Sequence, residues 1–315
     1  MGISADKMVV EVAYLFPGQG TQFVGMGKDF YETFKESRQV FDKANELLGF
    51  DLKNICFNGP AEELVKTSIS QPAILTTSIA CLAALESKFK SEISPKFVAG
   101  LSLGEITALV AAGCLSFEEG VLFVRDRGKF MEEASAQNPG KMAAILGLSL
   151  EETEKVCAEA GAEIANLNCP GQIVISASQE NMQKAVDLAK ERGAKRAIIL
   201  DVSGPFHSSL MNPAALKLKE KLEKINLKQA NIPIVSNVTA QEETSPEKIK
   251  QNLFVQVSNR TLWEKSMHYM ISKNVNTFLE IGPGKVLSGF MKKIDAQKAV
   301  YNIEKIEDLD KLWQK

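Results

Sequence analysis

Residues 100–104 read Gly-Leu-Ser-Leu-Gly and match the pattern G-x-S-x-G. In this pattern the serine occupies a tight turn between a strand and a helix, and its hydroxyl is exposed as a nucleophile. The sequence predicts a strand over 97–99 and a helix over 105–112, so both flanking elements are expected. The start of that helix would offer free backbone N–H groups to an oxyanion. Ser102 is therefore a candidate nucleophile, and the alternative is that it only caps the helix.

A serine nucleophile needs a general base, and the chain has two histidines. His207 follows a predicted strand over 195–202, in a loop of the kind that often carries catalytic groups. His268 lies within a helical run, where a solvated helix-surface histidine is expected. We therefore predict that His207 is the base. An unperturbed imidazole pKa of ~6.5 would leave it neutral at cytoplasmic pH.

The elements that must position these two residues alternate between strands and helices, which predicts the α/β class. Two segments read as strands, 8–16 and 96–99. Three read as helices, 28–48, 72–89 and 117–134.

The middle of the chain has a different order of elements. It reads strand 141–148, helix 149–160, strand 162–168, strand 171–177, helix 179–193 and strand 195–202. This β-α-β-β-α-β order is the ferredoxin-like unit. We therefore predict a hydrolase-like α/β core with a parallel sheet, formed by 1–137 and 207–315, with a ferredoxin-like subdomain inserted at 138–206.

Composition excludes several classes of protein. The 315 residues carry 37 Lys and Arg against 39 Asp and Glu, which argues against a nucleic-acid binder. The five cysteines are scattered with no C-x-x-C pair, so we expect reduced thiols and no metal site. The apolar run near the start is too short and too interrupted for a membrane span. These features predict a cytoplasmic protein that binds neither nucleic acid nor membrane.

Eight short motifs along nearly the whole chain, in the same order, resemble the malonyl-CoA:acyl carrier protein transacylases of fatty acid synthesis and the acyltransferase domains of polyketide synthases. The resemblance implies the same fold, a hydrolase-like α/β core with an inserted ferredoxin-like subdomain. The motifs occupy residues 16–20, 70–73, 100–105, 127–131, 168–172, 205–208, 236–238 and 282–287.

The resemblance also implies a set of roles. Ser102 would carry the acyl ester, and His207 would act first as general base and then as general acid. A backbone carbonyl, that of Gln256, would orient the histidine in place of an aspartate. The backbone N–H groups of Gln19 and Leu103 would form the oxyanion hole.

Three further residues are implied to bind the acyl group. Arg127 would pair with the free malonyl carboxylate, because a guanidinium fork matches a carboxylate through two hydrogen bonds. Arg125 points about 160° away on a helix, at ~100° per residue, and only the motif match selects Arg127. Gln71 would line the acyl pocket. Phe206 is the residue type that accompanies malonyl selection, since its ring would occupy the space of an α-methyl group.

The sequence departs from the family in two places. Leu101 stands where the family usually has a histidine, so any polar role of that histidine is absent. Residues 258–263 lack the Pro-Val that commonly precedes the tryptophan, which bears on the assignment of Gln256.

The implied activity is transfer of a malonyl group from malonyl-CoA to the phosphopantetheine thiol of holo acyl carrier protein, with no metal or tightly bound cofactor, by a monomer. An acidic carrier protein would need a local basic patch, and the candidates are Lys195, Arg196, Lys285, Lys292 and Lys293. The alternatives are a trans-acting acyltransferase of a polyketide synthase, an esterase-type serine hydrolase, and a non-catalytic relative, the last suggested by Leu101.

Overall fold

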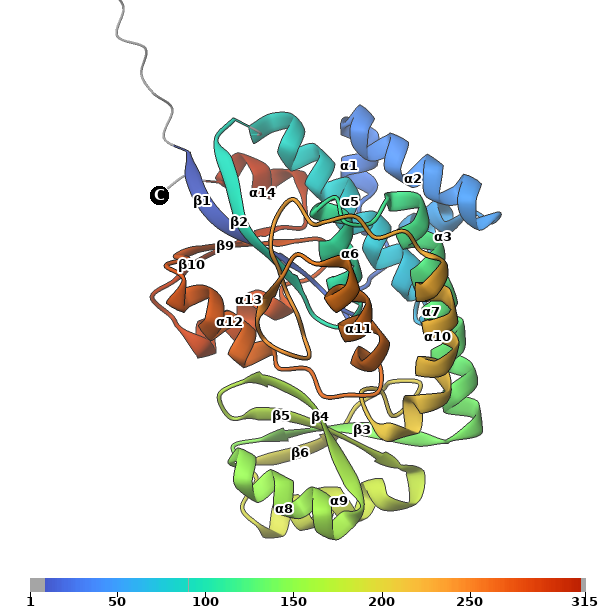
Figure 1. The fold of residues 1–315 in the computed structure, drawn as a ribbon, viewed down its shortest axis with the longest axis vertical. Coiled ribbons are helices and arrows are strands. Elements are labelled where there is room, and N and C mark those ends of the chain that lie inside the picture. The colour runs from blue at the N-terminus through green and yellow to red at the C-terminus, as the bar shows by residue number, and fades with distance from the viewer. Residues whose placement is uncertain (1–8, 90, 313–315) are drawn as a thin grey trace, which may run out of the picture.

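A computed structural model describes residues 9–89 and 91–312, and within these ranges the chain forms two β-sheets. Figure 1 shows the larger sheet among most of the helices and the smaller sheet below it, with α8 and α9 on its outer side. The mixed α/β class, with a parallel sheet and a small antiparallel sheet, confirms the predicted fold class.

The large sheet has the strand order β10-β9-β1-β2-β7-β8. All neighbouring strands run parallel except β7 and β8. The carboxyl ends of parallel strands meet at one edge of a sheet, where ligands of α/β proteins bind. The strands are β1 Val10–Phe16, β2 Ile93–Gly100, β7 Ile234–Val235, β8 Glu242–Glu243, β9 Thr277–Ile281 and β10 Ala299–Ile303.

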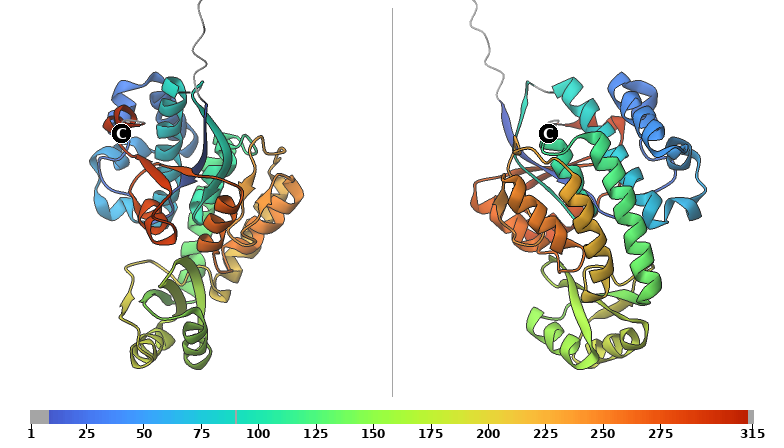
Figure 2. Two further views of the ribbon diagram at one scale, coloured as in Figure 1. Left: turned by 90° about the vertical axis from the view of Figure 1, so that its left-hand side faces the viewer. Right: turned by 45° about the vertical axis from the view of Figure 1, so that its right-hand side comes forward.

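The helices around this sheet cover both of its faces (Figures 1 and 2). They are α1 Lys28–Thr33, α2 Lys35–Leu48, α3 Leu52–Asn58, α4 Ala61–Leu64, α5 Thr67–Phe89, α6 Leu103–Ala111, α7 Phe117–Gln137, α10 Asn212–Lys224, α11 Pro246–Gln256, α12 Trp263–Ser272, α13 Val286–Ile294 and α14 Ile306–Lys311, with the 3-10 turn η1 Ser209–Met211.

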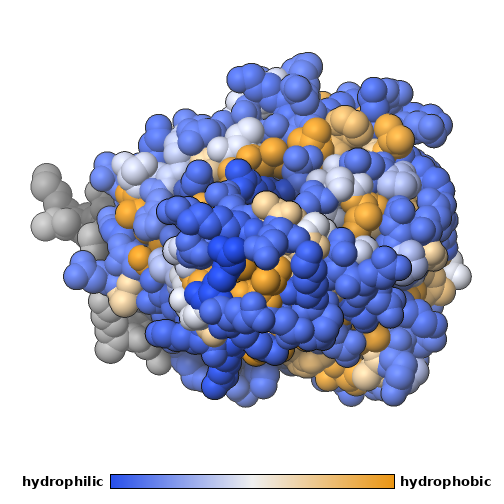
Figure 3. Space-filling model, turned by 90° about the horizontal axis from the view of Figure 1, so that it is seen from below, coloured by the Kyte–Doolittle hydropathy of each residue, from blue (hydrophilic) through white to orange (hydrophobic). Residues whose placement is uncertain are grey.

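The small sheet has the order β4-β5-β3-β6, and every neighbouring pair is antiparallel. Its elements are β3 Gly140–Leu146, α8 Leu150–Ala160, β4 Ala162–Cys169, β5 Gln172–Ser178, α9 Gln179–Glu191 and β6 Arg196–Ile199. The two helices pack over a separate apolar core. Their outer face is mostly hydrophilic, with hydrophobic residues confined to separate patches (Figure 3). All six elements fall within 138–206; those domain limits themselves stay a prediction.

Two helices differ from the sequence prediction. The predicted helix 28–48 is two helices, because Phe34 is extended at φ −105° and ψ 127° and breaks the hydrogen-bond ladder. The helix predicted from Pro72 begins at Thr67, and Pro72 lies inside it. The predicted strand over 8–16 begins at Val10, and Met8 lies outside the described residues.

Helix α5 is long and apolar enough to cross a membrane by length and composition, alone in this respect within the described ranges. However, 78% of its apolar window is buried inside the protein. Its buried face includes Ile74, Leu75 and Leu85, which belong to the main hydrophobic core. These contacts identify α5 as a core helix.

Candidate active site

Ser102 lies between the end of β2 and the start of α6, at the carboxyl edge of the large sheet. Its backbone has φ 54° and ψ −106°, a sparsely populated conformation that costs about 1–3 kcal/mol. The flanking glycines permit this turn: a Cβ on Gly100 would overlap the carbonyl of Gly104, and a Cβ on Gly104 would overlap the carbonyl of Phe16. The strand–turn–helix context predicted for G-x-S-x-G is therefore present.

Asn237 holds this turn from the other side. Its Oδ1 accepts a hydrogen bond from the Ser102 N–H at 2.7 Å, and its Nδ2 donates to the Gly100 carbonyl at 2.7 Å. The side chain thus ties the strained residue to the last residue of β2. Sequence reasoning noted the motif at 236–238 but assigned Asn237 no role, although an asparagine there could have been read as a turn clamp.

His207 faces Ser102 directly, with 2.8 Å between its Nε2 and the serine Oγ. Its Nδ1 lies 2.9 Å from the carbonyl oxygen of Gln256 and 3.1 Å from that of Asn259. Carbonyl oxygens only accept hydrogen bonds, so Nδ1 carries the proton and Nε2 presents its lone pair to the serine. This is the tautomer that a general base requires.

The pKa of His207 is lowered to about 4, first by burial and then by the positive charge of Arg127, which together outweigh the two carbonyls that raise it. The unperturbed value assumed from the sequence is therefore wrong for this environment. The lowered pKa suits His207 to act as a base, because the imidazole is neutral throughout the physiological pH range. His268 is exposed on α12, away from the site.

Arg127 projects from α7 and is buried, with 2% of its surface exposed. Its Nη2 donates to Ser102 Oγ at 3.0 Å and to Gln256 Oε1 at 3.0 Å, and its Nη1 donates to Gln71 Oε1 at 2.9 Å. Burial lowers its pKa to about 10, so it remains charged at neutral pH. Arg125, by contrast, lies over the Phe50 ring at 5.8 Å.

Gln256, the last residue of α11, contacts several of these groups at once. Its backbone carbonyl accepts from His207, as the family resemblance implied. Its side-chain Nε2 donates to the Ser102 carbonyl at 3.0 Å and to Glu105 Oε2 at 2.7 Å. Sequence reasoning missed both the side-chain contacts of Gln256 and the second carbonyl, that of Asn259. Neither carries a local sequence signal, because the partners are distant in the chain.

The two proposed oxyanion donors both lie beside the serine. Leu103 is the first residue of α6, and Gln19 lines the same cleft as Ser102. Within the described part of the chain, neither backbone N–H donates a hydrogen bond, so both are available to a ligand. The Gln19 side chain is anchored by a hydrogen bond from its Nε2 to Thr67 Oγ1 at 3.2 Å.

A cleft of about 410 Å³ leads to Ser102 and His207 between the two sheets. The elements around the large sheet contribute Gln19, Leu101 and Phe290, and the small sheet contributes a wall that includes Asn168. Phe206 also lines the cleft and is buried, directly before the histidine. Gln71 is buried behind it and contacts Arg127. The sequence-predicted site residues therefore come together around one cleft.

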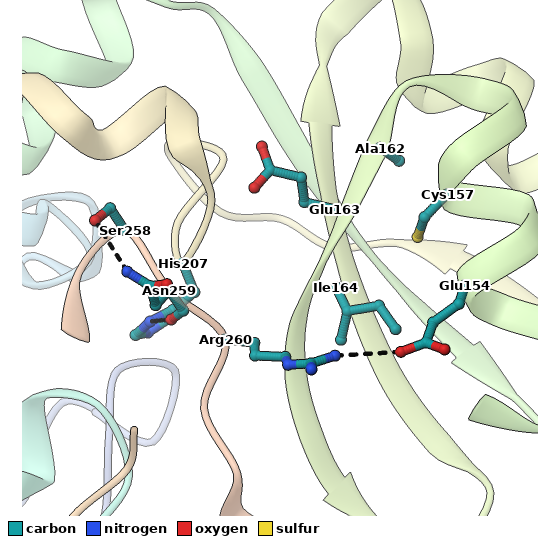
Figure 4. Close-up of a pocket in the computed structure, with 9 residues that line it drawn as sticks. All are labelled: Glu154, Cys157, Ala162, Glu163, Ile164, His207, Ser258, Asn259 and Arg260. Atoms are coloured by element: carbon teal, nitrogen blue, oxygen red, sulfur yellow. Dashed lines mark hydrogen bonds and ion pairs between the residues drawn. The ribbon is translucent and has the colours of Figure 1, made fainter. Parts of the chain in front are cut away.

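A second groove, of about 320 Å³, opens near His207 but is not lined by Ser102. Figure 4 shows His207 and Asn259 on one side and the small-domain residues on the other, with an ion pair between Arg260 and Glu154 across it at 3.3 Å. Next to it, the N–H of Thr261 donates to the Ala165 carbonyl at 2.8 Å. The segment that supplies the Asn259 carbonyl is thus tied to β4 of the small sheet.

No group of three or more His, Cys, Asp or Glu side chains able to hold a metal occurs in the ranges 9–89 and 91–312. The chemistry these side chains can perform is acyl transfer: a serine nucleophile, a neutral histidine base, two free N–H donors and a buried cation beside the nucleophile.

A parallel α/β core with an inserted antiparallel sheet, and a Ser–His pair at their junction, define the acyl transferase class of protein. The acyl transferase domain family matches residues 13–307. The malonyl CoA-acyl carrier protein transacylase of Bacillus subtilis is 52% identical over 291 residues, covering 90% of each chain. The crystal structure of malonyl CoA-acyl carrier protein transacylase from Clostridium perfringens is 43% identical with a TM-score of 0.91, covering 96% of both chains.

A further solved structure holds a type II PKS acyl-carrier protein in complex with its malonyl-transacylase. The match has a TM-score of 0.92 and 38% identity, and covers 96% of this chain and 98% of that one. The chain belongs to the malonyl CoA-acyl carrier protein transacylase family of acyl transferases.

Proposed function

We propose that this protein transfers the malonyl group of malonyl-CoA to the phosphopantetheine thiol of holo acyl carrier protein, through an ester on Ser102, and so supplies fatty acid biosynthesis. In enzyme terms it is an acyl-carrier-protein S-malonyltransferase. The observation that carries the proposal is the 3.0 Å contact between Arg127 Nη2 and Ser102 Oγ. A malonyl carboxylate lies two bonds from the thioester carbonyl carbon, so a cation beside the nucleophile suits this acyl group.

In the first half of the reaction, His207 Nε2 takes the Ser102 proton as Oγ attacks the thioester carbonyl. The tetrahedral oxyanion is held by the N–H groups of Gln19 and Leu103, which act where negative charge develops. The intermediate collapses, the C–S bond breaks, and the imidazolium returns its proton to the leaving CoA thiolate. Malonyl-Ser102 and free CoA remain.

In the second half of the reaction, the thiol of the carrier protein is the nucleophile. His207 removes the thiol proton, the sulfur attacks the ester carbonyl, and the C–O bond to Ser102 breaks. The proton then passes from His207 to Ser102 Oγ, which regenerates the enzyme. Arg127 holds the malonyl carboxylate in both halves through its guanidinium fork.

The carrier partner is supported by the names of the relatives and by the solved complex with an acyl-carrier protein. Among the sequence candidates for its basic patch, Lys293 donates to Gln172 at the cleft wall at 3.1 Å, and Lys285 precedes the cleft residue Val286. We propose these two residues as contacts of the acidic carrier, and that the enzyme works as a cytoplasmic monomer without metal or bound cofactor. Five buried free cysteines fit a reducing compartment.

The same solved complex favours a second candidate, a trans-acting acyltransferase that serves a polyketide synthase. The chemistry is identical, so the two differ only in the carrier that is served. Comparing kcat/KM for a fatty acid carrier and a polyketide carrier distinguishes them, and we expect the fatty acid carrier to be preferred.

The proposal is tested by the intact mass of the protein after mixing with malonyl-CoA, with Ser102→Ala as control. We expect one malonyl adduct, absent in the control, that persists until holo acyl carrier protein removes it as malonyl-carrier. An adduct that decays at the same rate without carrier would instead identify an esterase-type hydrolase. No adduct in the wild type would identify a non-catalytic relative in which Leu101 marks a disabled site.

A further inference from the structure

Glu105 is a buried carboxylate directly behind the reacting residues. It lies in the first turn of α6, three residues after Ser102, with 3% of its surface exposed, and it does not line the cleft. Its Oε2 accepts hydrogen bonds from Gln256 Nε2 at 2.7 Å and from the Asn237 N–H at 3.2 Å. Gln256 and Arg127 connect Glu105 to Ser102 Oγ through successive hydrogen bonds, so any effect of Glu105 on the reaction must pass through its neighbours.

The side-chain amide of Gln256 connects Glu105 to Arg127, and it has one donor end and one acceptor end. The donor end faces Glu105 Oε2 and the Ser102 carbonyl, and the acceptor end faces Arg127 Nη2 at 3.0 Å. A flipped amide would set its NH₂ group against a guanidinium, which only donates, and its oxygen against the Ser102 carbonyl and the ionised form of Glu105, which only accept. Glu105 and Arg127 together therefore permit one orientation.

The charges of Glu105 and Arg127 favour the same orientation of the Gln256 amide. The pKa of Glu105 is raised to about 7, because burial outweighs the hydrogen bonds from Gln256 and Asn237 and the charge of Arg127, which lower it. In turn, the negative charge of Glu105 raises the pKa of Arg127 against the effect of burial. Glu105 and Arg127 are joined by one amide, and the guanidinium lies at 3.0 Å from Ser102 Oγ.

We propose that Glu105 is a positioning residue, which fixes the Gln256 amide so that Arg127 stays beside Ser102 and the site selects acyl groups that bear a carboxylate. This inference rests on the proposed function, because it assumes that Arg127 binds the malonyl carboxylate. It assigns selectivity to a residue that the substrate does not contact. The acyl chemistry of Ser102 and His207 continues without it.

Glu105→Met and Glu105→Gln separate the roles of this residue. Methionine keeps the length of the side chain and removes the acceptor, whereas the glutamine oxygen can still accept from Gln256 and Asn237. We expect Glu105→Met to lower kcat/KM for malonyl-CoA about 10- to 100-fold, mainly through KM, in line with the loss of hydrogen bonds to a charged group. Acylation by acetyl-CoA should change less than about threefold, and Glu105→Gln should recover most of the loss.

A double-mutant cycle tests whether Glu105 acts through Gln256. In the Gln256→Met background, adding Glu105→Met should leave the ratio of malonyl to acetyl acylation unchanged. The double variant replaces both polar partners by apolar groups of similar shape, which buried sites tolerate far better than one unpaired partner. The comparison of Gln256→Met with the double variant does not use Glu105→Met alone, so it decides the question even if that single variant does not fold.

Three results would overturn the inference: equal losses for malonyl-CoA and acetyl-CoA in Glu105→Met, no recovery in Glu105→Gln, or a further change of the ratio in the double variant. Failure of the proposed function looks different. In that case the wild-type protein itself shows no preference for malonyl-CoA and forms no malonyl adduct on Ser102.

Discussion

Two buried glutamates, Glu105 and Glu280, lie next to strands of the large sheet and differ in what surrounds them. Glu280, in β9, accepts from the N–H groups of Leu287 and Ser288, from the Ser288 hydroxyl and from Asn302, all close to the start of α13. Burial raises the pKa of both carboxyls.

The partners of Glu105 lead elsewhere. Through Gln256 they reach Ser102 and Arg127, which come from different parts of the chain. Glu280 therefore caps a helix and stabilises the fold, whereas Glu105 belongs to the reactive region. Burial and a raised pKa are common to both regions, so only the hydrogen-bond partners distinguish the glutamate next to the reactive residues from the one that caps a helix.

Removing the base should have the largest effect. His207→Ala deletes the group 2.8 Å from Ser102 Oγ, and general base catalysis is worth about 10²- to 10⁴-fold. We expect a loss of that size in the rate of malonyl-enzyme formation, measured by quenched-flow mass spectrometry. His268→Ala, the matched control on α12, should acylate at the wild-type rate. Equal rates in His207→Ala and wild type would remove His207 from the mechanism.

Removing the buried cation should affect one class of substrate. Arg127→Leu should lower kcat/KM for malonyl-CoA about 100-fold, since two charge-assisted hydrogen bonds to the carboxylate are lost. Acylation by acetyl-CoA, which has no carboxylate, should not fall. Arg125→Leu is the matched control, because that side chain lies over Phe50. Parallel losses on both substrates would show that Arg127 serves the fold and not the acyl group.

Shape selection at the cleft should be weaker. Phe206→Ser opens space for an α-methyl group, and one methyl is worth about 1–3 kcal/mol in a hydrophobic pocket. We expect the ratio of methylmalonyl to malonyl transfer to rise about tenfold, measured by competition between the two CoA esters. Phe290→Leu, at another wall of the same cleft, should leave the ratio unchanged. A constant ratio in Phe206→Ser would assign the selectivity to another residue.

The pH dependence should be small. The pKa of His207 is lowered to about 4, so the imidazole remains neutral as the pH falls from 7.5 towards 5. We expect kcat/KM for malonyl-CoA to fall less than about twofold between pH 7.5 and 5.5, whereas an unperturbed histidine would cost about tenfold. The same lowered pKa means that the unfolded chain binds the additional proton below pH ~6.5, so this group destabilises the fold as the pH falls from there.

The structural glutamate should give the smallest catalytic effect. Glu280→Gln weakens the cap of α13, which is worth about 1 kcal/mol, and should lower the melting temperature slightly. Its malonyl-to-acetyl ratio should stay within about twofold of wild type, in contrast to Glu105→Met. Thermal melts and the two acylation rates check both statements. A changed ratio in Glu280→Gln would erase the distinction between the two glutamates.

The features that the sequence predicts correctly depend on residues that are close together in the chain. The strand, turn and helix around Ser102 follow from residues 97–112, and the order of elements over 141–202 predicts the antiparallel sheet. Two local signals were misleading. Phe34 looks helical by spacing but is extended, and Pro72 looks like a helix start although α5 already begins at Thr67.

What the sequence could not predict depends on distant contacts. Gln256 meets Glu105 across 151 positions and Arg127 across 129, and no local pattern encodes such pairs. The family resemblance supplied the carbonyl of Gln256 but not the contacts of its side chain. The low pKa of His207 likewise follows mainly from burial, which depends on segments that are distant in the chain.

The central claim is that one ester on Ser102 lies on the path of transfer. The most direct test is a rapid-quench experiment that follows malonyl-Ser102 in the wild-type protein during its reaction with malonyl-CoA and holo acyl carrier protein. We predict that the ester forms and is discharged to the carrier at rates at least equal to turnover, and that Ser102→Ala shows neither. Transfer that proceeds faster than the ester forms, or that persists in Ser102→Ala, would contradict the account.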